Sequence, residues 1–143
     1  GRAQAYGPGF DDYINHRANR LVVIAQIEHV AAVENLSEIL AVPGIDGTII
    51  GPYDLSGSVG HAGDLEHVEV AKLLDRYEQV SQAAGKAMGY HVIAPLAEPV
   101  LEKVRAGYTF LAFSTDFLFL GDACRRELRA FRAGLTRRES ESS

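Results

Sequence analysis

Short apolar runs rich in branched residues alternate along the chain with longer stretches in which apolar residues recur every three to four positions. An unbroken apolar run is typical of a strand that is covered on both faces of a parallel sheet, and the longer period is typical of an amphipathic helix. The pattern therefore predicts strands near residues 21–27, 47–51, 87–93 and 108–113.

The stretches between these runs predict helices, several of which end at recognisable stop signals. Gly85 and Gly107 follow two of the stretches, and Pro43 with Gly44 follows another. The segment after the second strand is rich in Gly and Ser and is predicted to be a loop, at 51–63. The expected helices cover residues 10–19, 33–40, 65–84, 96–106 and 117–133.

Strands that alternate with helices indicate βαβ units and a parallel sheet, so the predicted fold class is α/β. Four such units suit either an open four-stranded sheet or one half of a (β/α)₈ barrel, a fold of about 250 residues. The chain has 143 residues, begins without Met and contains only Met88, which favours the C-terminal part of a longer protein. We expect residues 1–135 to form one partial domain and 136–143 to form a polar tail.

Composition and charge narrow the class of protein. Hydrophobic residues make up 47% of the chain, as in ordinary globular domains, and the formal net charge is −5. No basic surface argues for a nucleic acid or an anionic membrane as a partner, and no apolar run is long enough to span a bilayer. The single cysteine, Cys124, excludes an intrachain disulfide and favours a reducing compartment, so we expect a cytoplasmic protein.

The first candidate functional residue is Glu28, which follows the first predicted strand. Side chains alternate along a strand, so Gln26 and Glu28 share a face. A carboxylate that ends a buried apolar strand is costly to desolvate unless something neutralises it. A metal ion, an ion pair or a place at the start of a helix would each explain Glu28, and the residue alone does not choose among them.

The second candidate is Asp54, which follows the second predicted strand. Gly51 and Pro52 before it force an irregular turn, which exposes backbone N–H groups and orients the Asp54 side chain. A helix-capping role for Asp54 is the simpler alternative.

Together the two acids are more informative. Consecutive parallel strands are usually neighbours about 5 Å apart, and their C-terminal ends meet at the same edge of an α/β fold. Two carboxylates there would repel each other unless they shared a cation, and hard oxygen ligands suit Mg²⁺ or Mn²⁺. The pair therefore predicts a divalent-cation site with Glu28 and Asp54 as ligands.

The residues around both acids resemble a known family. They are similar to the HpcH/HpaI family of metal-dependent (class II) pyruvate aldolases, which dihydroxyheptenedioate aldolase and dehydrodeoxyglucarate aldolase typify. The interval of 26 residues from Glu28 to Asp54 and the flanking motifs match together, and the resemblance extends from about Leu21 to Phe131. The matching motifs lie at 25–28, 35–40, 43–47 and 50–56, with further matches at 67–70, 84–86 and 106–112.

The resemblance implies a (β/α)₈ TIM barrel of the phosphoenolpyruvate/pyruvate type, of which this chain holds the last four units. It also implies a carbon–carbon lyase that cleaves a 4-hydroxy-2-oxo acid to pyruvate and an aldehyde, through an enolate stabilised by Mg²⁺, Mn²⁺ or Co²⁺. Glu28 and Asp54 would bind the cation, and the full-length protein would be a homo-oligomer. The oxoacid would be contacted by Gln26, Gly51, Pro52 and Tyr53.

The catalytic His and the substrate-binding Arg of the family lie on early strands, upstream of the residues in this chain. No residue of this chain inherits those roles, so the chain alone is expected to lack the groups that move protons and stabilise charge. Two alternatives stay open. One is a CoA-ester lyase of the citrate lyase β type, and the other is a non-catalytic half-barrel that binds a metal or an oxoacid and needs a partner chain.

The remaining histidines and the cysteine have simpler structural explanations. His29 is expected to serve packing or to support the site from outside it. His91 is expected to be structural, with a polar residue that lines the barrel as the alternative. We expect His61 and His67 to be solvated, in the loop after Asp54 and at the start of the next helix. Cys124 is expected to be a small core residue of the last helix.

Overall fold

A four-stranded parallel sheet forms the centre of the computed structural model, which describes residues 1–141 and, for side chains, residues 1–135. The strands lie in the order of the sequence and every neighbouring pair is parallel, as the alternation of strands and helices predicted. They are β1 (Ile24–Ile27), β2 (Gly47–Ile50), β3 (Ala87–Val92) and β4 (Phe110–Phe113).

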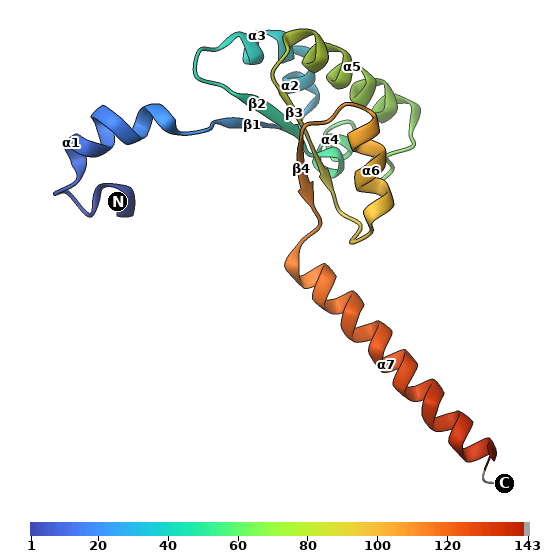
Figure 1. Cartoon of the computed structure of the whole chain (residues 1–143). Helices are drawn as coiled ribbons and strands as arrows, with labels where there is room; N and C mark the ends of the chain where they lie inside the picture. The colour runs from blue at the N-terminus through green and yellow to red at the C-terminus, as the bar shows by residue number, and fades with distance from the viewer. Residues whose placement is uncertain (142–143) are drawn as a thin grey trace.

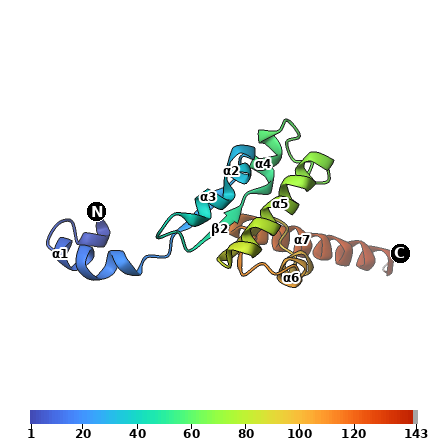
Figure 2. The same ribbon diagram turned by 90° about the horizontal axis from the view of Figure 1, so that it is seen from above.

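Helices connect the strands and gather on one side of the sheet, while the two ends of the chain extend away from it (Figure 1). The longest connecting helix is α5, which contacts α2, α3, α4 and β3 (Figure 2). The connecting helices are α2 (Val30–Glu34), α3 (Leu36–Ala41), α4 (Pro52–Ser58), α5 (Val68–Ala84) and α6 (Ala97–Arg105).

The hydrophobic core lies between these helices and one face of the sheet. Side chains on that face alternate along the strands, as the period of two requires. The strands contribute Ile27, Ile50, Met88, Tyr90 and Val92, and the helices contribute Val33, Leu36, Leu40, Leu55 and Tyr77, all of them buried.

A polar cluster inside this core joins α5 to two strands. The Tyr77 hydroxyl lies 3.0 Å from Thr48 Oγ1, donates to the Gly89 carbonyl at 3.0 Å and accepts from the Gly89 N–H at 3.2 Å. Gly89 permits this close packing, because a Cβ there would lie 2.6 Å from the Thr48 carbonyl oxygen. The cluster satisfies polar groups that would be costly to bury unpaired.

The opposite face of the sheet is not covered by helices. Gln26 on β1 is exposed, and Phe110 on the edge strand β4 is 40% exposed. β1 and β4 are the two open edges of the sheet. The expectation from the apolar strands was that each would be covered on both faces, and the described residues cover one.

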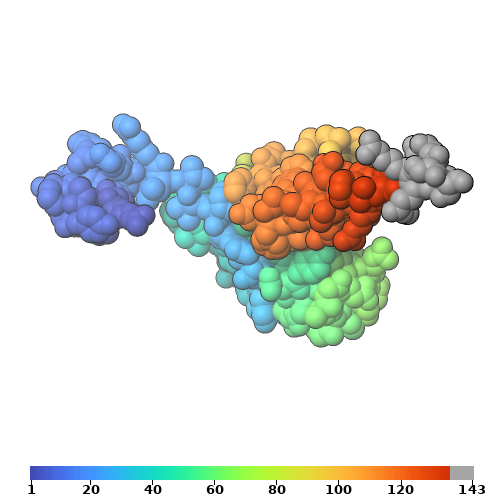
Figure 3. All heavy atoms as spheres, turned by 90° about the horizontal axis from the view of Figure 1, so that it is seen from below, coloured from blue at the N-terminus to red at the C-terminus, as the bar shows by residue number. Residues whose placement is uncertain are grey.

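The N-terminal segment and the last helix project from the body. Figure 3 shows the N-terminal segment as a lobe that a narrow neck joins to the rest. The last helix, α7 (Asp116–Glu141), extends beyond the predicted end at residue 133 and points away from the sheet (Figure 1). The N-terminal segment is helical throughout 10–20 and comprises η1 (Arg2–Gln4), α1 (Phe10–Asp12), η2 (Tyr13–Arg17) and η3 (Ala18–Arg20).

Three local predictions were wrong. The helix expected at 33–40 is two helices, because Asn35 ends α2 and its side-chain amide donates to the Ala31 carbonyl at 2.8 Å. The loop expected at 51–63 contains α4, in which Pro52 occupies a first-turn position that does not need its N–H. Cys124 is exposed rather than part of the core, and α7, which carries it, projects away from the sheet.

None of the helices among the described residues is both long enough and apolar enough to cross a membrane.

Candidate metal centre

The C-terminal ends of β1 and β2 lie side by side, as the sequence predicted. Ile27 pairs with Ile50 in the parallel register, and the N–H of Gly51 donates to the Ile27 carbonyl at 2.9 Å. This last hydrogen bond places Glu28, the residue after β1, beside Gly51, the residue after β2. The end of β1 that carries Glu28 and the turn that leads to Asp54 therefore meet at one edge of the sheet.

Glu28, Gln26 and Gly51 are in contact at this edge. The Gln26 amide Nε2 donates to Glu28 Oε2 at 2.7 Å, which fixes the direction of the carboxylate. A Cβ placed on Gly51 would lie 3.2 Å from Glu28 Oε2 and 3.6 Å from Gln26 Nε2. The missing side chain of Gly51 is therefore what gives the Glu28 carboxylate its space.

Asp54 lies on the first turn of α4, three residues after Gly51. Gly51 is the N-cap residue of this helix with extended backbone (φ −100°, ψ 90°), and Pro52 follows it. Among residues 1–135 no hydrogen bond or ion pair engages the Asp54 carboxylate, and no Lys, Arg or His pairs with Glu28. Residues 1–135 thus supply no cation to either acid.

Glu28 differs from the sequence argument in one respect. We expected Glu28 to end a buried strand, where its charge would need neutralising, but the Glu28 side chain is exposed. Solvent can hydrate the carboxylate, so no desolvation penalty by itself demands a metal. The case for a cation depends on the arrangement of the oxygen ligands at this edge.

The donor set at this edge fits a hard divalent cation. Two carboxylates come from consecutive strand ends, and one of them is already oriented by an amide. Mg²⁺ and Mn²⁺ are typically bound by one or two carboxylates together with water and ligand oxygens. Both acids are exposed, which leaves room for those further ligands.

Pro52 and Tyr53 line a neighbouring hollow of about 170 Å³ over the end of β3. Tyr53 is 48% exposed, while Pro52 is buried. The lining also includes His91 and Lys103, but it does not include Glu28 or Asp54. Among the predicted substrate-binding residues, Gln26 and Gly51 therefore lie with Glu28, whereas Pro52 and Tyr53 line this neighbouring hollow.

The wall of this hollow is aromatic and carries one cation. Lys103 Nζ lies 4.2 Å above the Tyr90 ring and 5.3 Å from the Tyr108 ring, within the range of a cation–π contact. Burial raises the pKa of Tyr90 above its usual value. Burial also raises the pKa of Tyr108, and its hydrogen bond to Glu78 Oε1 at 2.8 Å adds to that shift. Both phenols are therefore protonated at neutral pH, and Tyr108 is the one that donates a hydrogen bond to Glu78.

The histidines occupy positions that the sequence did not fully predict. His29 is exposed and caps α2, since its Nδ1 accepts from the Ala31 N–H at 3.1 Å. His61 and His67 were expected to be solvated, but both are half-buried and their rings stack at 3.4 Å between centroids. Spacing alone could not show this stacking, because it depends on how the loop after α4 folds back.

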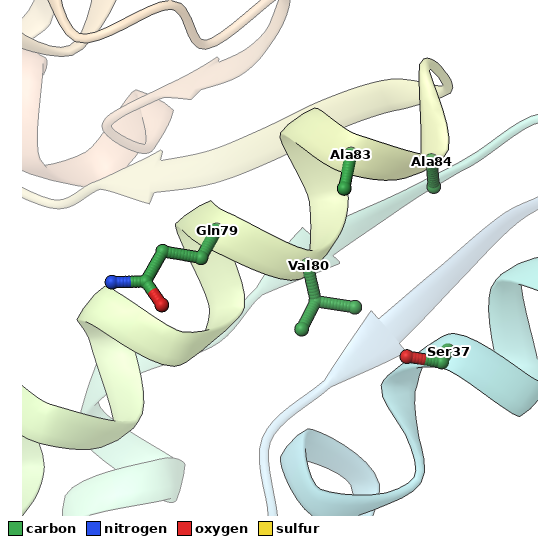
Figure 4. A pocket seen from close by; sticks show the side chains of 5 residues that line it. All are labelled: Ser37, Gln79, Val80, Ala83 and Ala84. Carbon is green, nitrogen blue, oxygen red and sulfur yellow. The ribbon is translucent and has the colours of Figure 1, made fainter.

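Another hollow lies elsewhere, in a groove of about 380 Å³ between α3 and α5. Figure 4 shows its lining of Val80, Ala83 and Ala84 from α5, with Gln79, facing Ser37 of α3. No titratable group lines this groove, so it offers no acid, base or metal ligand.

Comparison with known proteins agrees with the fold. A family model described as HpcH/HpaI aldolase/citrate lyase matches residues 6–120. The chain belongs to this family. The family resemblance predicted from the motifs around Glu28 and Asp54 is thus confirmed.

Individual members of the family match over most of this chain. The 2-keto-3-deoxy-L-rhamnonate aldolase of Escherichia coli strain K12 is 35% identical over 133 residues, which are 93% of this chain and 49% of the relative. An HpcH/HpaI aldolase/citrate lyase family protein from Burkholderia cenocepacia superposes with a TM-score of 0.79 and 31% identity, over 87% of this chain and 48% of that one. The HpcH/HpaI aldolase from Desulfitobacterium hafniense superposes with a TM-score of 0.74 and 30% identity, over 86% of this chain and 47% of that one.

The chain spans about half the length of the relatives that it matches. Its four βα units correspond to about half of the solved family structures, which confirms the predicted fold class of a half (β/α)₈ barrel. The relatives are aldolases by name. The activity and the substrate of the whole protein are therefore proposals.

Proposed function

We propose that this chain supplies the cation- and oxoacid-binding part of a carbon–carbon lyase that cleaves a 4-hydroxy-2-oxo acid to pyruvate and an aldehyde. One observation carries the proposal. The Glu28 carboxylate, oriented by Gln26, lies against Gly51 at the edge from which Asp54 also arises, and no protein cation among residues 1–135 pairs with either acid. Such an edge of adjacent parallel strands is where α/β enzymes place their ligands.

Each residue has a defined part in this proposal. Glu28 and Asp54 would hold Mg²⁺, Mn²⁺ or Co²⁺, which would supply Lewis-acid chemistry toward the oxygen atoms of the oxoacid. Gln26 keeps the Glu28 carboxylate in place and presents an amide to the same edge. The backbone around Gly51, Pro52 and Tyr53 would contact the oxoacid carboxylate.

The groups that transfer protons are proposed to come from outside this chain. The chain matches about half of the named aldolase, so the complete site would draw on residues from the other half of the barrel. A sugar-derived 2-keto-3-deoxy acid is the substrate class proposed first, because the related aldolase is named for one.

Metal binding tests the first half of the proposal. Mn²⁺ binding to the 143-residue chain is measured by equilibrium dialysis for the wild type and for Glu28→Gln and Asp54→Asn. Each substitution removes one charged ligand and is expected to lower the affinity by at least the 10- to 100-fold typical of losing an outer-shell partner. Glu34→Gln and Asp75→Asn are matched controls, since both change acids on the helices away from this edge. Equal loss in the controls would contradict the assignment.

Pyruvate release tests the second half. We expect Mn²⁺-dependent release of pyruvate from 2-keto-3-deoxy-L-rhamnonate by a longer polypeptide that contains this chain, and loss of release on Glu28→Gln. Release by the 143-residue chain alone would exclude the non-catalytic alternative. Cleavage of an acyl-CoA ester with no cleavage of the oxoacid would instead support the citrate lyase β type and contradict the proposal.

A further inference from the structure

Two histidines and one glutamate converge where the loop after α4 meets the start of α5. The His61 and His67 rings stack with centroids 3.4 Å apart and an interplanar angle of 20°. His61 Nε2 lies 3.6 Å from Glu69 Oε2. One ligand atom from each of the three residues lies within 4.8 Å of the other two. Among the described residues this is the one group of three or more such side chains.

The chemistry of this set differs from that of the Glu28 edge. Two imidazoles and one carboxylate suit a borderline cation such as Zn²⁺ more than Mg²⁺, which prefers oxygen ligands. In a tetrahedral zinc site with bonds of about 2.0–2.2 Å, ligand atoms lie roughly 3.3–3.5 Å apart. The 3.6 Å separation of His61 Nε2 and Glu69 Oε2 is already close to this value. A water molecule would complete the four ligands.

The position of the set is held by the fold. The His61 N–H donates to the Ser56 carbonyl at 2.9 Å, and the Gly63 N–H donates to Ser56 Oγ at 2.8 Å, so buried Ser56 anchors the loop to α4. His67 is the N-cap residue of α5, which places Glu69 on the first turn of that helix. His61 and His67 are half-buried, which lowers the entropy that metal binding would have to remove.

His67 already makes one hydrogen bond that a metal would replace. Its Nδ1 accepts from the Glu69 N–H at 3.3 Å, so in the neutral ring Nε2 carries the proton. Binding through either nitrogen gives up this bond, since a ligating ring has a single lone pair. The bond is long for an N–H donor, so the loss is small compared with a metal–imidazole bond. The two nearly parallel rings would also have to turn apart, because each imidazole binds a metal in the plane of its ring.

We propose that His61, His67 and Glu69 form a second metal site, for Zn²⁺ or a similar borderline divalent cation, that fastens the loop at 59–67 to α5. The site shares no ligand with the Glu28 edge. Its effect on the rest of the molecule is local: the loop also carries Leu65, which lines the hollow beside Tyr53. A bound cation would hold that wall of the hollow in place.

Zinc binding to the full chain tests this site. Glu28→Gln and Asp54→Asn are both introduced first, so that the other edge does not contribute. Equilibrium dialysis is expected to find one Zn²⁺ per chain, with a rise in Tm on zinc addition. Adding His61→Gln or His67→Asn is expected to lower the zinc affinity at least tenfold and to abolish the rise in Tm. In His67→Asn the new side-chain oxygen can still cap α5, so a loss of zinc binding would not result from unfolding of this helix.

Two control variants test whether the effect on zinc binding is specific to the proposed ligands. Glu66→Gln removes an exposed acid from the same loop, and His16→Gln removes an exposed histidine from the N-terminal segment. Both are expected to bind zinc like the parent. Co²⁺ provides a second measurement, because a tetrahedral site with two imidazoles gives a strong visible spectrum. Zinc affinity that is unchanged by His61→Gln, or a weak octahedral spectrum in the parent, would overturn the proposal.

Discussion

The Glu28 carboxylate lies against the Cα of Gly51, so that a methyl group on Gly51 would approach both Oε2 and Cβ of Glu28 to 3.2 Å. Gly51 has φ −100° and ψ 90°, a conformation that other residues also adopt. Its backbone therefore does not require glycine. Glycine is required because the Glu28 carboxylate, at the end of the neighbouring strand, occupies the space that a side chain on residue 51 would fill.

We expect Gly51→Ala to weaken Mn²⁺ binding without unfolding the chain. The new methyl group would displace the Glu28 carboxylate and disturb its 2.7 Å hydrogen bond from Gln26. By analogy with loss of an outer-shell partner, the affinity should fall about 10- to 100-fold. Equilibrium dialysis measures the affinity, and thermal denaturation measures the stability.

Gly57→Ala is the control for this substitution. Gly57 lies in α4, and a Cβ there would meet no other atom within 4 Å. Its Mn²⁺ affinity should match that of the wild type. If Gly51→Ala binds Mn²⁺ as tightly as Gly57→Ala does, the Glu28 edge is not the cation site.

Removal of the Tyr77 hydroxyl should destabilise the fold. Tyr77→Phe leaves Thr48 Oγ1 and the Gly89 backbone without their hydroxyl partner in a fully buried place. An unsatisfied buried polar group costs about 1–3 kcal/mol, and the free energy of unfolding from urea titration should fall by that amount. Tyr6→Phe changes a residue that is 78% exposed and should alter stability little. Equal values for the two variants would show that the cluster does not stabilise the core.

The buried tyrosines make the stability fall at alkaline pH. The pKa of Tyr108 is raised chiefly by burial, and also by its hydrogen bond to Glu78, while an unfolded tyrosine ionises near pH 10. Above about pH 10 the unfolded chain therefore binds fewer protons than the folded one, and the free energy of unfolding decreases as pH rises. Below about pH 10 the folded and the unfolded chain both keep the tyrosine proton, so the stability that depends on it is fully present.

Tyr108→Phe should reduce this loss of stability above about pH 10, by up to about 1.4 kcal/mol for each pH unit. The measurement compares the free energy of unfolding near pH 8 and near pH 11 for the variant, the wild type and Tyr6→Phe. Phenolate absorbance gives an independent check, because part of the tyrosine signal should appear only as the chain unfolds. A slope that Tyr108→Phe leaves unchanged would contradict this source of the pH dependence.

The sequence predicted the parts of the fold that local pattern determines. All four strands and their order follow from apolar runs, and the meeting of Glu28 with Gly51 follows from the pairing of consecutive strands. The break at Asn35 was missed because a side-chain hydrogen bond, not a change of period, ends α2. The helix α4 was missed because its Gly and Ser residues favour loops, while tertiary packing of Leu55 overrides that preference.

The same limit applies to the candidate site. Residue types and spacing predicted both acids as cation ligands, and this stays a prediction. They could not show that Glu28 is exposed or that His61 stacks on His67, because burial and loop folding depend on contacts far apart in the sequence. The exposure of Cys124 has the same origin: the helical period is regular, but it does not show that α7 projects away from the sheet.

The uncovered apolar surfaces predict that the 143-residue chain associates. α7 carries an exposed stripe, with Phe117 and Leu120 each 67% exposed and Phe131 64% exposed. β1 and β4 add two unpaired strand edges. Exposed apolar surface and open edges both favour contact with another chain. Sedimentation velocity should therefore detect dimers or larger species, with a fraction that increases with protein concentration.

Charges placed in the stripe should reverse this association. Leu120→Glu with Leu128→Glu adds two negative charges where apolar side chains now face solvent, and the larger species should decrease at equal concentration. Arg126→Gln with Arg129→Gln makes the same change in net charge at exposed positions outside the stripe, and it should sediment like the wild type. A wild-type chain that sediments as a monomer and melts cooperatively would show that the sheet and α7 are stable without a partner. Equal dissociation in both double variants would instead assign the effect to net charge, because only the first pair alters the apolar stripe.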